Sequence, residues 1–405
     1  MSNKRIDIVL IVVLIFLAIA LAGGMIWGNL IYTRNSPVEK EFFVPWLSAR
    51  TFLEYGDSPY SEPSYQRTQI LYYGELAGEN EDPLYLWTSM PGLLFYLPFA
   101  LIKDYDLAMA FWTTMSEIAL LVAGFLLTRL LFKKISTWLL LPIILFVVLW
   151  SFSFKDLISG SPQPFGLLAL ACSFLALRNQ DDEIAGILLI IPFLIQGIFI
   201  GCIIFLFWWI LSQRRWRILT GFGMILGLLL LLSFLLLPDW VIPTLRGIFW
   251  RMIFNPGISV HTVMGSSWPV VGPRIGWIVT ILLCLLLLIN WRATKRHTFD
   301  HFLWTACLTI ATTPLLGLSI SLENYSVLIL PLLLLISIIY DRWPGKKLVN
   351  PGMIMLSLTW VAGWIAMLFF PPWTVLLFPL LISAGLLWVK WWMVKTPRTM
   401  IETWQ

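Results

Sequence analysis

The chain has 405 residues, of which 59% are hydrophobic and 12% charged, and its formal net charge is +5. Soluble domains carry about 25% charged residues, so the composition excludes an ordinary soluble protein and predicts an all-α polytopic membrane protein. The basic residues form small clusters between apolar segments, so we expect no nucleic-acid partner. All four cysteines fall inside apolar segments, which indicates neither a disulfide framework nor a zinc site.

Apolar segments of membrane-spanning hydropathy predict about twelve transmembrane helices in a single domain over residues 1–395, followed by a short tail over 396–405. The predicted crossings are 8–31, 106–132, 138–152, 165–178, 183–196, 198–211, 218–237, 274–291, 301–320, 326–340, 352–370 and 374–394. Because Lys and Arg collect on the cytoplasmic side of a membrane, both termini are expected in the cytoplasm, with the protein in the plasma membrane. The longest outer segments are then the first loop, 32–90, and a second loop, 238–273.

Two apolar stretches do not fit one simple crossing each. Residues 91–102 are too few to span the hydrocarbon core, and we interpret them as a re-entrant or interfacial helix. Residues 183–211 must cross twice, which predicts a break near Gln196-Gly197. Backbone at such a break is tolerated only against protein or a water-filled cavity. The break therefore predicts a cavity that opens to the outer face.

The first loop begins with a predicted amphipathic helix that lies on the membrane surface. Its apolar residues recur every three or four positions, at Phe42, Trp46, Ala49 and Leu53. Glu41, at the start of this helix, is a candidate general base toward an alcohol, or else an acid favoured there by the helix dipole. Asp57, in the stretch 56–60, is a second candidate carboxylate, although the residues around it favour a turn-forming role.

The other outer segments carry further polar candidates. Gln163 lies where a crossing begins and suits a hydrogen bond to a polar head group, or it only starts a helix after Pro162. Arg246 and Arg251 lie in the second loop, where they suit a lipid phosphate or simply snorkel to the interface. Glu323 lies in a tight outer turn, where a carboxylate is a functional candidate by default.

Several stretches, in their order along residues 5–345, resemble glycosyltransferase family 87, the polyprenol-phosphate-mannose-dependent mannosyltransferases of the C-type superfamily. The stretches that carry the resemblance are Glu41-Phe42 through Ala49 to Gly56-Asp57-Ser58-Pro59-Tyr60, the run 160–168, Ala185-Gly186, Arg214-Arg215-Trp216-Arg217 and the late turn from Thr313-Pro314 to Tyr325. The chain departs from the family pattern in three places. Glu41 replaces the usual Asp, Ile195-Gln196 replaces a basic residue, and Glu323-Asn324-Tyr325 replaces a turn that contains His.

The resemblance implies a C-type glycosyltransferase fold and an inverting transfer. A mannose-like sugar would pass from a polyprenyl-phosphate donor to a hydroxyl of a lipid-linked or envelope glycan acceptor, on the outer face. The implied roles are a base at Glu41 with Asp57 second, phosphate binding at Arg246, Arg251 and His261, and sugar or acceptor binding at Gln163, Glu323, Asn324 and Tyr60. Since the sequence indicates no nucleotide-sugar-binding fold, we expect no metal and no cofactor other than the donor.

Two other classes of function stay open at this stage. A lipid-linked glycan transporter or flippase needs charged residues through the membrane midplane, and Glu117 is the single acid in the interior of a predicted crossing. We interpret Glu117 as a helix–helix hydrogen-bonding residue, which disfavours a transporter. A non-catalytic membrane protein of envelope assembly remains compatible with the three departures from the family pattern.

Overall fold

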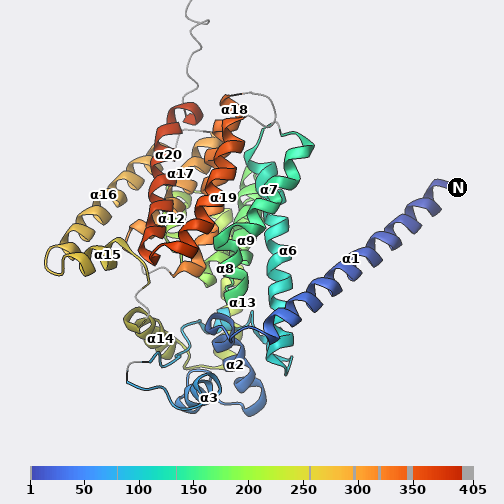
Figure 1. The fold of residues 1–405 in the computed structure, drawn as a ribbon, viewed down its shortest axis with the longest axis vertical. Helices are drawn as coiled ribbons and strands as arrows, with labels where there is room; N and C mark the ends of the chain where they lie inside the picture. The colour runs from blue at the N-terminus through green and yellow to red at the C-terminus, as the bar shows by residue number, and fades with distance from the viewer. Residues whose placement is uncertain are drawn as a thin grey trace, which may run out of the picture.

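The structure is a computed structural model that describes residues 2–79, 81–133, 135–254, 257–294, 298–317, 321–343 and 350–394, and in these ranges its regular elements are helices (Figure 1). The long helices are α1 (Ser2–Arg34), α6 (Tyr105–Leu131), α13 (Trp216–Leu236), α16 (Gly272–Ala293), α19 (Pro351–Phe369) and α20 (Leu377–Val394). The medium helices are α2 (Lys40–Tyr55), α3 (Glu62–Tyr73), α7 (Thr137–Leu149), α9 (Gln163–Arg178), α12 (Phe199–Gln213), α14 (Val241–Phe254), α17 (Phe299–Thr312) and α18 (Ile329–Arg342). The short helices are α4 (Met90–Leu93), α5 (Leu97–Ala100), α8 (Ser151–Ser159), α10 (Asp182–Leu188), α11 (Ile190–Ile195), α15 (Val260–Ser267), η2 (Thr313–Leu315), η3 (Leu322–Leu328) and η4 (Pro372–Leu376).

Among the described residues, seven helices are long and apolar enough to cross a membrane, or eight if α7 and α8, bent by 50°, form one crossing. A helical multi-pass membrane protein is therefore confirmed, but the expected twelve crossings are not. The difference lies in helices such as α9, with 16 residues, and α12, with 15. At 1.5 Å per residue each is about 24 Å long or less, short of a hydrocarbon core of about 30 Å.

Both of the irregular stretches predicted from the sequence are confirmed as irregular. Residues 91–102 contain only α4 and α5, each of four residues, so they form no spanning helix. The helix also breaks where the charge pattern required it, between α11 and α12. Gln196 and Gly197 there have φ of 63° and 61°, in the left-handed region, which ends one helix and re-aims the next.

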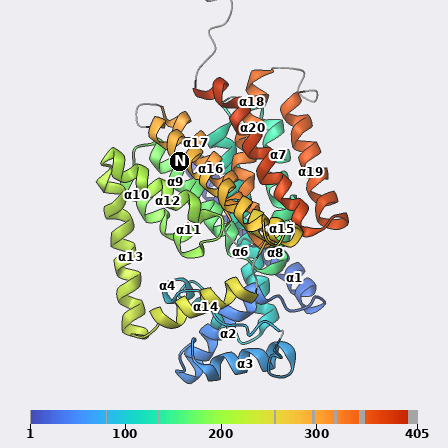
Figure 2. The ribbon, with the colours of Figure 1, turned by 90° about the vertical axis from the view of Figure 1, so that its left-hand side faces the viewer.

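The first loop and α14 lie together below the helix bundle (Figures 1 and 2). The predicted helix α2 exists, but its apolar residues pack on protein: the Phe42 ring lies 5.0 Å from that of Trp112 on α6. Leu53, the last residue of the predicted apolar face, is 45% exposed. In contrast to α2, helix α14 has an exposed apolar face. This face is formed at three- and four-residue spacing by Ile242, Leu245, Phe249 and Ile253. A face of this kind suits the membrane surface.

The N-terminal helix α1 leans away from the bundle and meets α6 near its C-terminal end (Figure 1). The Asn29 side-chain amide donates to Thr114 at 2.9 Å and to Glu117 at 3.1 Å. The interpretation of Glu117 as a helix–helix hydrogen-bonding residue is thus confirmed. A carboxylate that accepts a hydrogen bond from a neighbouring helix does not suggest a path for ions through the membrane.

Helices α10 and α13 pack with their backbones very close together, and this contact depends on two glycines. A Cβ added at Gly186 would lie 2.0 Å from the carbonyl oxygen of Ile218, and one at Gly221 would lie 2.2 Å from that of Glu183. Gly223, on the same helix α13, faces open space. Small residues therefore fix the position of α13, from which the chain leads directly into α14.

This contact predicts a position-specific effect of alanine. Gly186→Ala should lower the free energy of unfolding by about 1–3 kcal/mol, because the added methyl forces the two backbones apart. Gly223→Ala, the matched control, should leave stability unchanged or raise it slightly, since alanine is the better helix former. Denaturation of both variants in detergent micelles measures the difference. Equal stability of the two variants would contradict the close approach.

Candidate functional site

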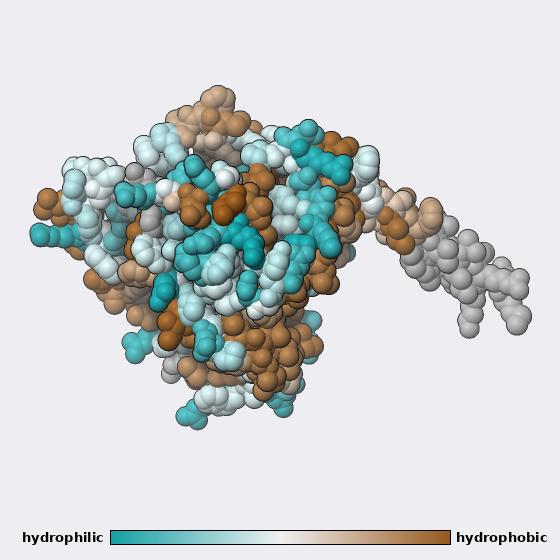
Figure 3. Space-filling model, turned by 90° about the horizontal axis from the view of Figure 1, so that it is seen from below, coloured by the Kyte–Doolittle hydropathy of each residue, from teal (hydrophilic) through white to brown (hydrophobic). Residues whose placement is uncertain are grey.

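A carboxylate and a guanidinium from the two outer loops of the sequence prediction meet on the face formed by α2, α3 and α14. An Arg251 guanidinium nitrogen lies 3.1 Å from a carboxylate oxygen of Glu41, although 210 residues separate them. Both side chains are largely buried, with exposed fractions of 23% and 13%. Figure 3 views this face and shows hydrophilic residues spread over its centre with hydrophobic residues among them. The sequence predicted both residues but could not predict their contact.

Local structure positions each partner. Glu41 lies in the first turn of α2, after the extended residue Glu39. Gly247 lets α14 lie directly on the backbone of the first loop, since a Cβ there would be 2.2 Å from the carbonyl oxygen of Leu86. This approach places the Arg251 guanidinium 3.6 Å from the centre of the Trp87 ring. Stacking on the indole orients the guanidinium as well as stabilising its charge.

The ion pair lines a small pocket with aromatic and charged walls. Its lining includes Lys40, Asp82, Tyr85, Trp87 and Trp250 together with the pair itself. Lys40 pairs with Asp82 at 2.8 Å, and the Tyr85 and Trp250 rings are 5.9 Å apart. The cavity volume is about 30 Å³, which is room for one or two waters. A larger polar ligand can therefore enter only if the ion pair opens.

A second polar cluster forms at the helix breaks. Gln163, in the first turn of α9, is 1% exposed, and its amide nitrogen donates to the side-chain oxygen of Asn324 in η3. Asn324 in turn donates to the Ser321 hydroxyl at 2.8 Å. The backbone of Gly197 passes beside both, since a Cβ there would lie 2.8 Å from the Gln163 nitrogen. The Gln163 amide oxygen is buried and has no hydrogen-bond partner among the described residues.

Trp87 connects the two clusters. Besides the pocket of the ion pair, it lines a neighbouring cavity of about 50 Å³ whose wall includes Pro162 and Ile195. Pro162 precedes Gln163, and Ile195 precedes the broken turn at Gln196. The amide cluster at the helix breaks therefore borders the same region as the ion pair, from the side of the bundle.

Three other candidates lie apart from the ion pair. Asp57 lies two residues beyond the end of α2, and that end is about 20 Å along the helix from Glu41 at 1.5 Å per residue. It is 42% exposed, and its carboxylate lies 3.7 Å from Arg67. Arg246 is exposed on α14. His261 lies on α15, which packs beside α16 away from α14, and its ring is 5.2 Å from that of Trp277 (Figure 1).

Tyr60 and Glu323 complete the predicted set. The Tyr60 hydroxyl donates to the carbonyl oxygen of Thr88 at 2.7 Å, and burial raises its pKa above the usual range. Tyr60 therefore stays protonated and fastens the turn after α2 to the segment that carries Trp87. The side chain of Glu323 lies outside the described residues, so its predicted role stays a prediction.

Sequence reasoning missed Asp156. This residue of α8 is fully buried, and its carboxylate accepts a hydrogen bond from the Ser326 hydroxyl of η3, two residues from Asn324. The backbone N–H of Ser161 donates to the Asp156 carbonyl oxygen at 3.0 Å, which closes the turn before α9. An acid in the outer segment 152–164 was the available signal. Asp156 thus supports the amide cluster through Ser326 and Ser161.

The family model for glycosyltransferase family 87 matches residues 89–316, more than half of the chain. The chain belongs to glycosyltransferase family 87. No curated protein and no solved structure matches it significantly.

Family membership makes the chain a membrane glycosyltransferase and confirms the resemblance stated from the sequence. The matched stretch is narrower than the 5–345 of that resemblance. It contains Gln163, Arg246, Arg251 and His261, whereas Glu41, Asp57 and Tyr60 precede it and Asn324 follows it. Within the described residues, no group of three or more His, Cys, Asp or Glu side chains is placed to hold a metal ion.

The amide cluster predicts energetic coupling between Gln163 and Asn324. A double-mutant cycle of Gln163→Ala and Asn324→Ala, measured on the free energy of unfolding, should give a coupling free energy of about 0.5–3 kcal/mol. The reason is that each change removes the same buried contact. A control cycle pairs Gln163→Ala with Thr359→Ala on α19, whose hydroxyl bonds only its own helix. The control should be additive. Additive behaviour in both cycles would contradict the cluster.

Proposed function

We propose that this family 87 glycosyltransferase moves a mannose-like sugar from a polyprenyl-phosphate donor to a hydroxyl of a lipid-linked or envelope glycan acceptor. The observation that supports this most is the Glu41–Arg251 pair in a pocket walled by Tyr85, Trp87 and Trp250. An arginine suits a phosphate, a carboxylate suits a hydroxyl proton, and aromatic walls suit sugar rings. The exposed apolar face of α14 keeps this pocket at the membrane surface, where a lipid-bound substrate reacts.

The ion pair suggests how binding prepares the reaction. The donor phosphate replaces Glu41 as the partner of Arg251, which opens the small pocket and leaves the carboxylate to the acceptor. The acceptor oxygen then forms a bond to the anomeric carbon as the bond from that carbon to the phosphate oxygen breaks. The phosphate leaves with the bonding electrons, and the hydroxyl proton passes to Glu41. Attack opposite the leaving phosphate inverts the anomeric carbon.

The remaining candidates take supporting roles in this proposal. Gln163 and Asn324 offer amide groups to sugar hydroxyls at the helix breaks, and Asp57 serves as a turn residue. Arg246 and His261 attract the donor phosphate from outside its first contact with Arg251. Arg251 supplies the positive charge for the phosphate, so the reaction is proposed to need no metal ion.

The proposal predicts a large, specific loss of activity for Glu41→Gln. Glutamine keeps the shape and a hydrogen bond to Arg251 but cannot take the acceptor proton, so transfer should fall about 10²- to 10⁴-fold. Glu41→Asp, which restores the carboxylate, should recover part of the rate, and Asp57→Asn should stay within a few-fold of wild type. The measurement is formation of labelled glycolipid from labelled polyprenyl-phosphate sugars and a membrane-lipid extract.

Three outcomes of this assay oppose the proposal at different points. Wild-type rates in Glu41→Gln would remove Glu41 as the base. A loss in Asp57→Asn with Glu41→Gln intact would move the base to the other end of α2. If wild-type protein forms no glycolipid with any donor, the non-catalytic alternative replaces the enzyme.

The active pocket is proposed to face outward in the plasma membrane, with both termini in the cytoplasm. The basic clusters of the sequence support this orientation. A cysteine at Ser61, beside α3, should therefore react with a membrane-impermeant maleimide added to intact cells, and one at Lys346 should react only after permeabilisation. A variant with the four native cysteines replaced provides the background. The reverse pattern would invert the topology.

A further inference from the structure

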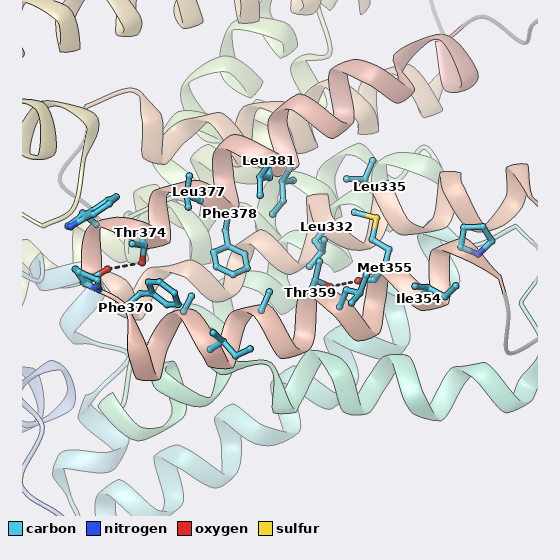
Figure 4. Close-up of a pocket in the computed structure, with 18 residues that line it drawn as sticks. Leu332, Leu335, Ile354, Met355, Thr359, Phe370, Thr374, Leu377, Phe378 and Leu381 are labelled. Atoms are coloured by element: carbon cyan, nitrogen blue, oxygen red, sulfur yellow. Dashed lines mark hydrogen bonds between the residues drawn. The ribbon is translucent and has the colours of Figure 1, made fainter.

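A long apolar groove runs along the C-terminal helices, outside the residues matched by the family model (Figure 4). Helices α19 and α20 both pack on α18, and the groove lies between them. Leu332 and Leu335 of α18 line it together with Met355 of α19 and Phe378 and Leu381 of α20. Its volume of about 1060 Å³ lies at the upper end of the range for small-molecule sites.

The groove is as long as the membrane core is thick. Its lining includes Pro351, the first residue of α19, and Phe370, the residue after its end. At 1.5 Å per residue these positions are about 28 Å apart, close to the full hydrocarbon thickness of about 30 Å. The acyl chain of a phospholipid covers one leaflet, about half of that length. A single chain that fills this groove must therefore be longer than an ordinary lipid tail.

The lining of the groove is almost entirely hydrocarbon. Thr359 and Thr374 carry its side-chain hydroxyls, and each donates to a backbone carbonyl of its own segment, at 2.8 Å to Met355 and 2.7 Å to Pro371 (Figure 4). Each hydroxyl hydrogen is therefore already used, and neither hydroxyl can donate to a water in the groove. An apolar lining of this kind favours an apolar chain over solvent.

One end of the groove leads to a cation near the proposed active pocket. Ala366 and Phe370 line both the groove and a second cavity, whose wall includes Phe152 and Lys155 of α8. The Lys155 ammonium lies 3.7 Å from the carboxylate of Glu39, two residues before Glu41. The apolar groove therefore adjoins a cavity whose wall carries a positive charge, and that charge lies beside the residues that precede Glu41. An anionic head with a long tail matches this order of surfaces.

We propose that the groove between α19 and α20 holds the isoprenoid tail of the polyprenyl-phosphate donor, with Lys155 drawing the anionic head toward the pocket. The inference rests on the proposed function and adds a tail-binding site in a part of the chain that the family match does not include. The groove length selects a polyprenyl chain over a phospholipid, and the cation selects the phosphate over the free alcohol.

Photo-crosslinking tests occupancy without any assay of activity. The full-length protein in phosphatidylcholine–phosphatidylglycerol nanodiscs is irradiated with a long-chain polyprenyl phosphate that carries a diazirine in its tail, and labelled peptides are mapped by mass spectrometry. Labels should concentrate on α18, α19 and α20, and an excess of unlabelled long-chain polyprenyl phosphate should compete them away. A diazirine phosphatidylcholine that gives the same competed pattern would show a bulk-lipid surface and overturn the proposal.

A matched pair of tryptophan variants tests the groove by filling it. Ala362 lines the groove, whereas Leu368 on the same helix is 66% exposed and lies outside its lining. Ala362→Trp should reduce tail labelling at least five-fold and raise the KM for a long-chain donor about ten-fold, with kcat unchanged. It should leave a short-chain donor such as citronellyl-phosphate mannose unaffected. Leu368→Trp should leave labelling and both KM values at wild-type levels.

The two proposals fail in different ways. Labelling of the groove without sugar transfer would sustain the tail site and remove the enzyme assignment. Sugar transfer with equal KM changes for long and short donors in Ala362→Trp would sustain the enzyme and remove the tail site. Lys155→Gln separates the two parts of the ligand. It should lower labelling by the phosphate probe several-fold but not by the corresponding free polyprenol, and equal labelling by both probes would remove the role of Lys155.

Discussion

Backbone groups released by a helix break inside a membrane protein must be covered by protein, and the architecture of this chain depends on that constraint. The breaks before α9 and before α12 and the 3-10 turn η3 come together at Gln163, Gly197 and Asn324. The amide side chains and the buried Asp156–Ser326 contact hold the broken ends in place. A polar region is thereby fixed inside an apolar bundle, close to where the first loop docks.

The ion pair of Glu41 and Arg251 builds on this arrangement. Helix α13 is positioned by close glycine contacts with α10 and leads into α14, and α14 carries Arg251 onto Trp87 of the first loop. The proposed catalytic pocket is thus composite, with one charge from each loop and a tryptophan that also borders the broken helices. The apolar groove between α19 and α20 adjoins a cavity lined by Lys155, and Lys155 pairs with Glu39 just before the start of α2. The proposed tail site for a lipid substrate therefore adjoins the same first loop.

Much of the site was predictable as a set of parts. The break at Gln196-Gly197 followed from keeping basic clusters on one side, and Glu41 and Arg251 stood out as charges at a membrane surface. Asp57 was the second candidate for the base because it is an acid in the same loop as Glu41, but most of the length of helix α2 separates them. His261 followed Arg251 closely in sequence, yet it lies on a different helix that packs against α16. The distance along the sequence predicted neither the separation of Asp57 from Glu41 nor that of His261 from Arg251.

The sequence by itself determined the class of the molecule: a helical multi-pass chain with two polar loops and a broken apolar segment, because hydropathy and charge position decide which residues leave water. It also carried the resemblance to family 87 that the family match confirms. Only the tertiary structure decided which charges meet, that α2 packs on protein while α14 exposes its apolar face, and that Asp156 is buried. These outcomes depend on side-chain packing between segments up to 210 residues apart, and no local pattern encodes such contacts.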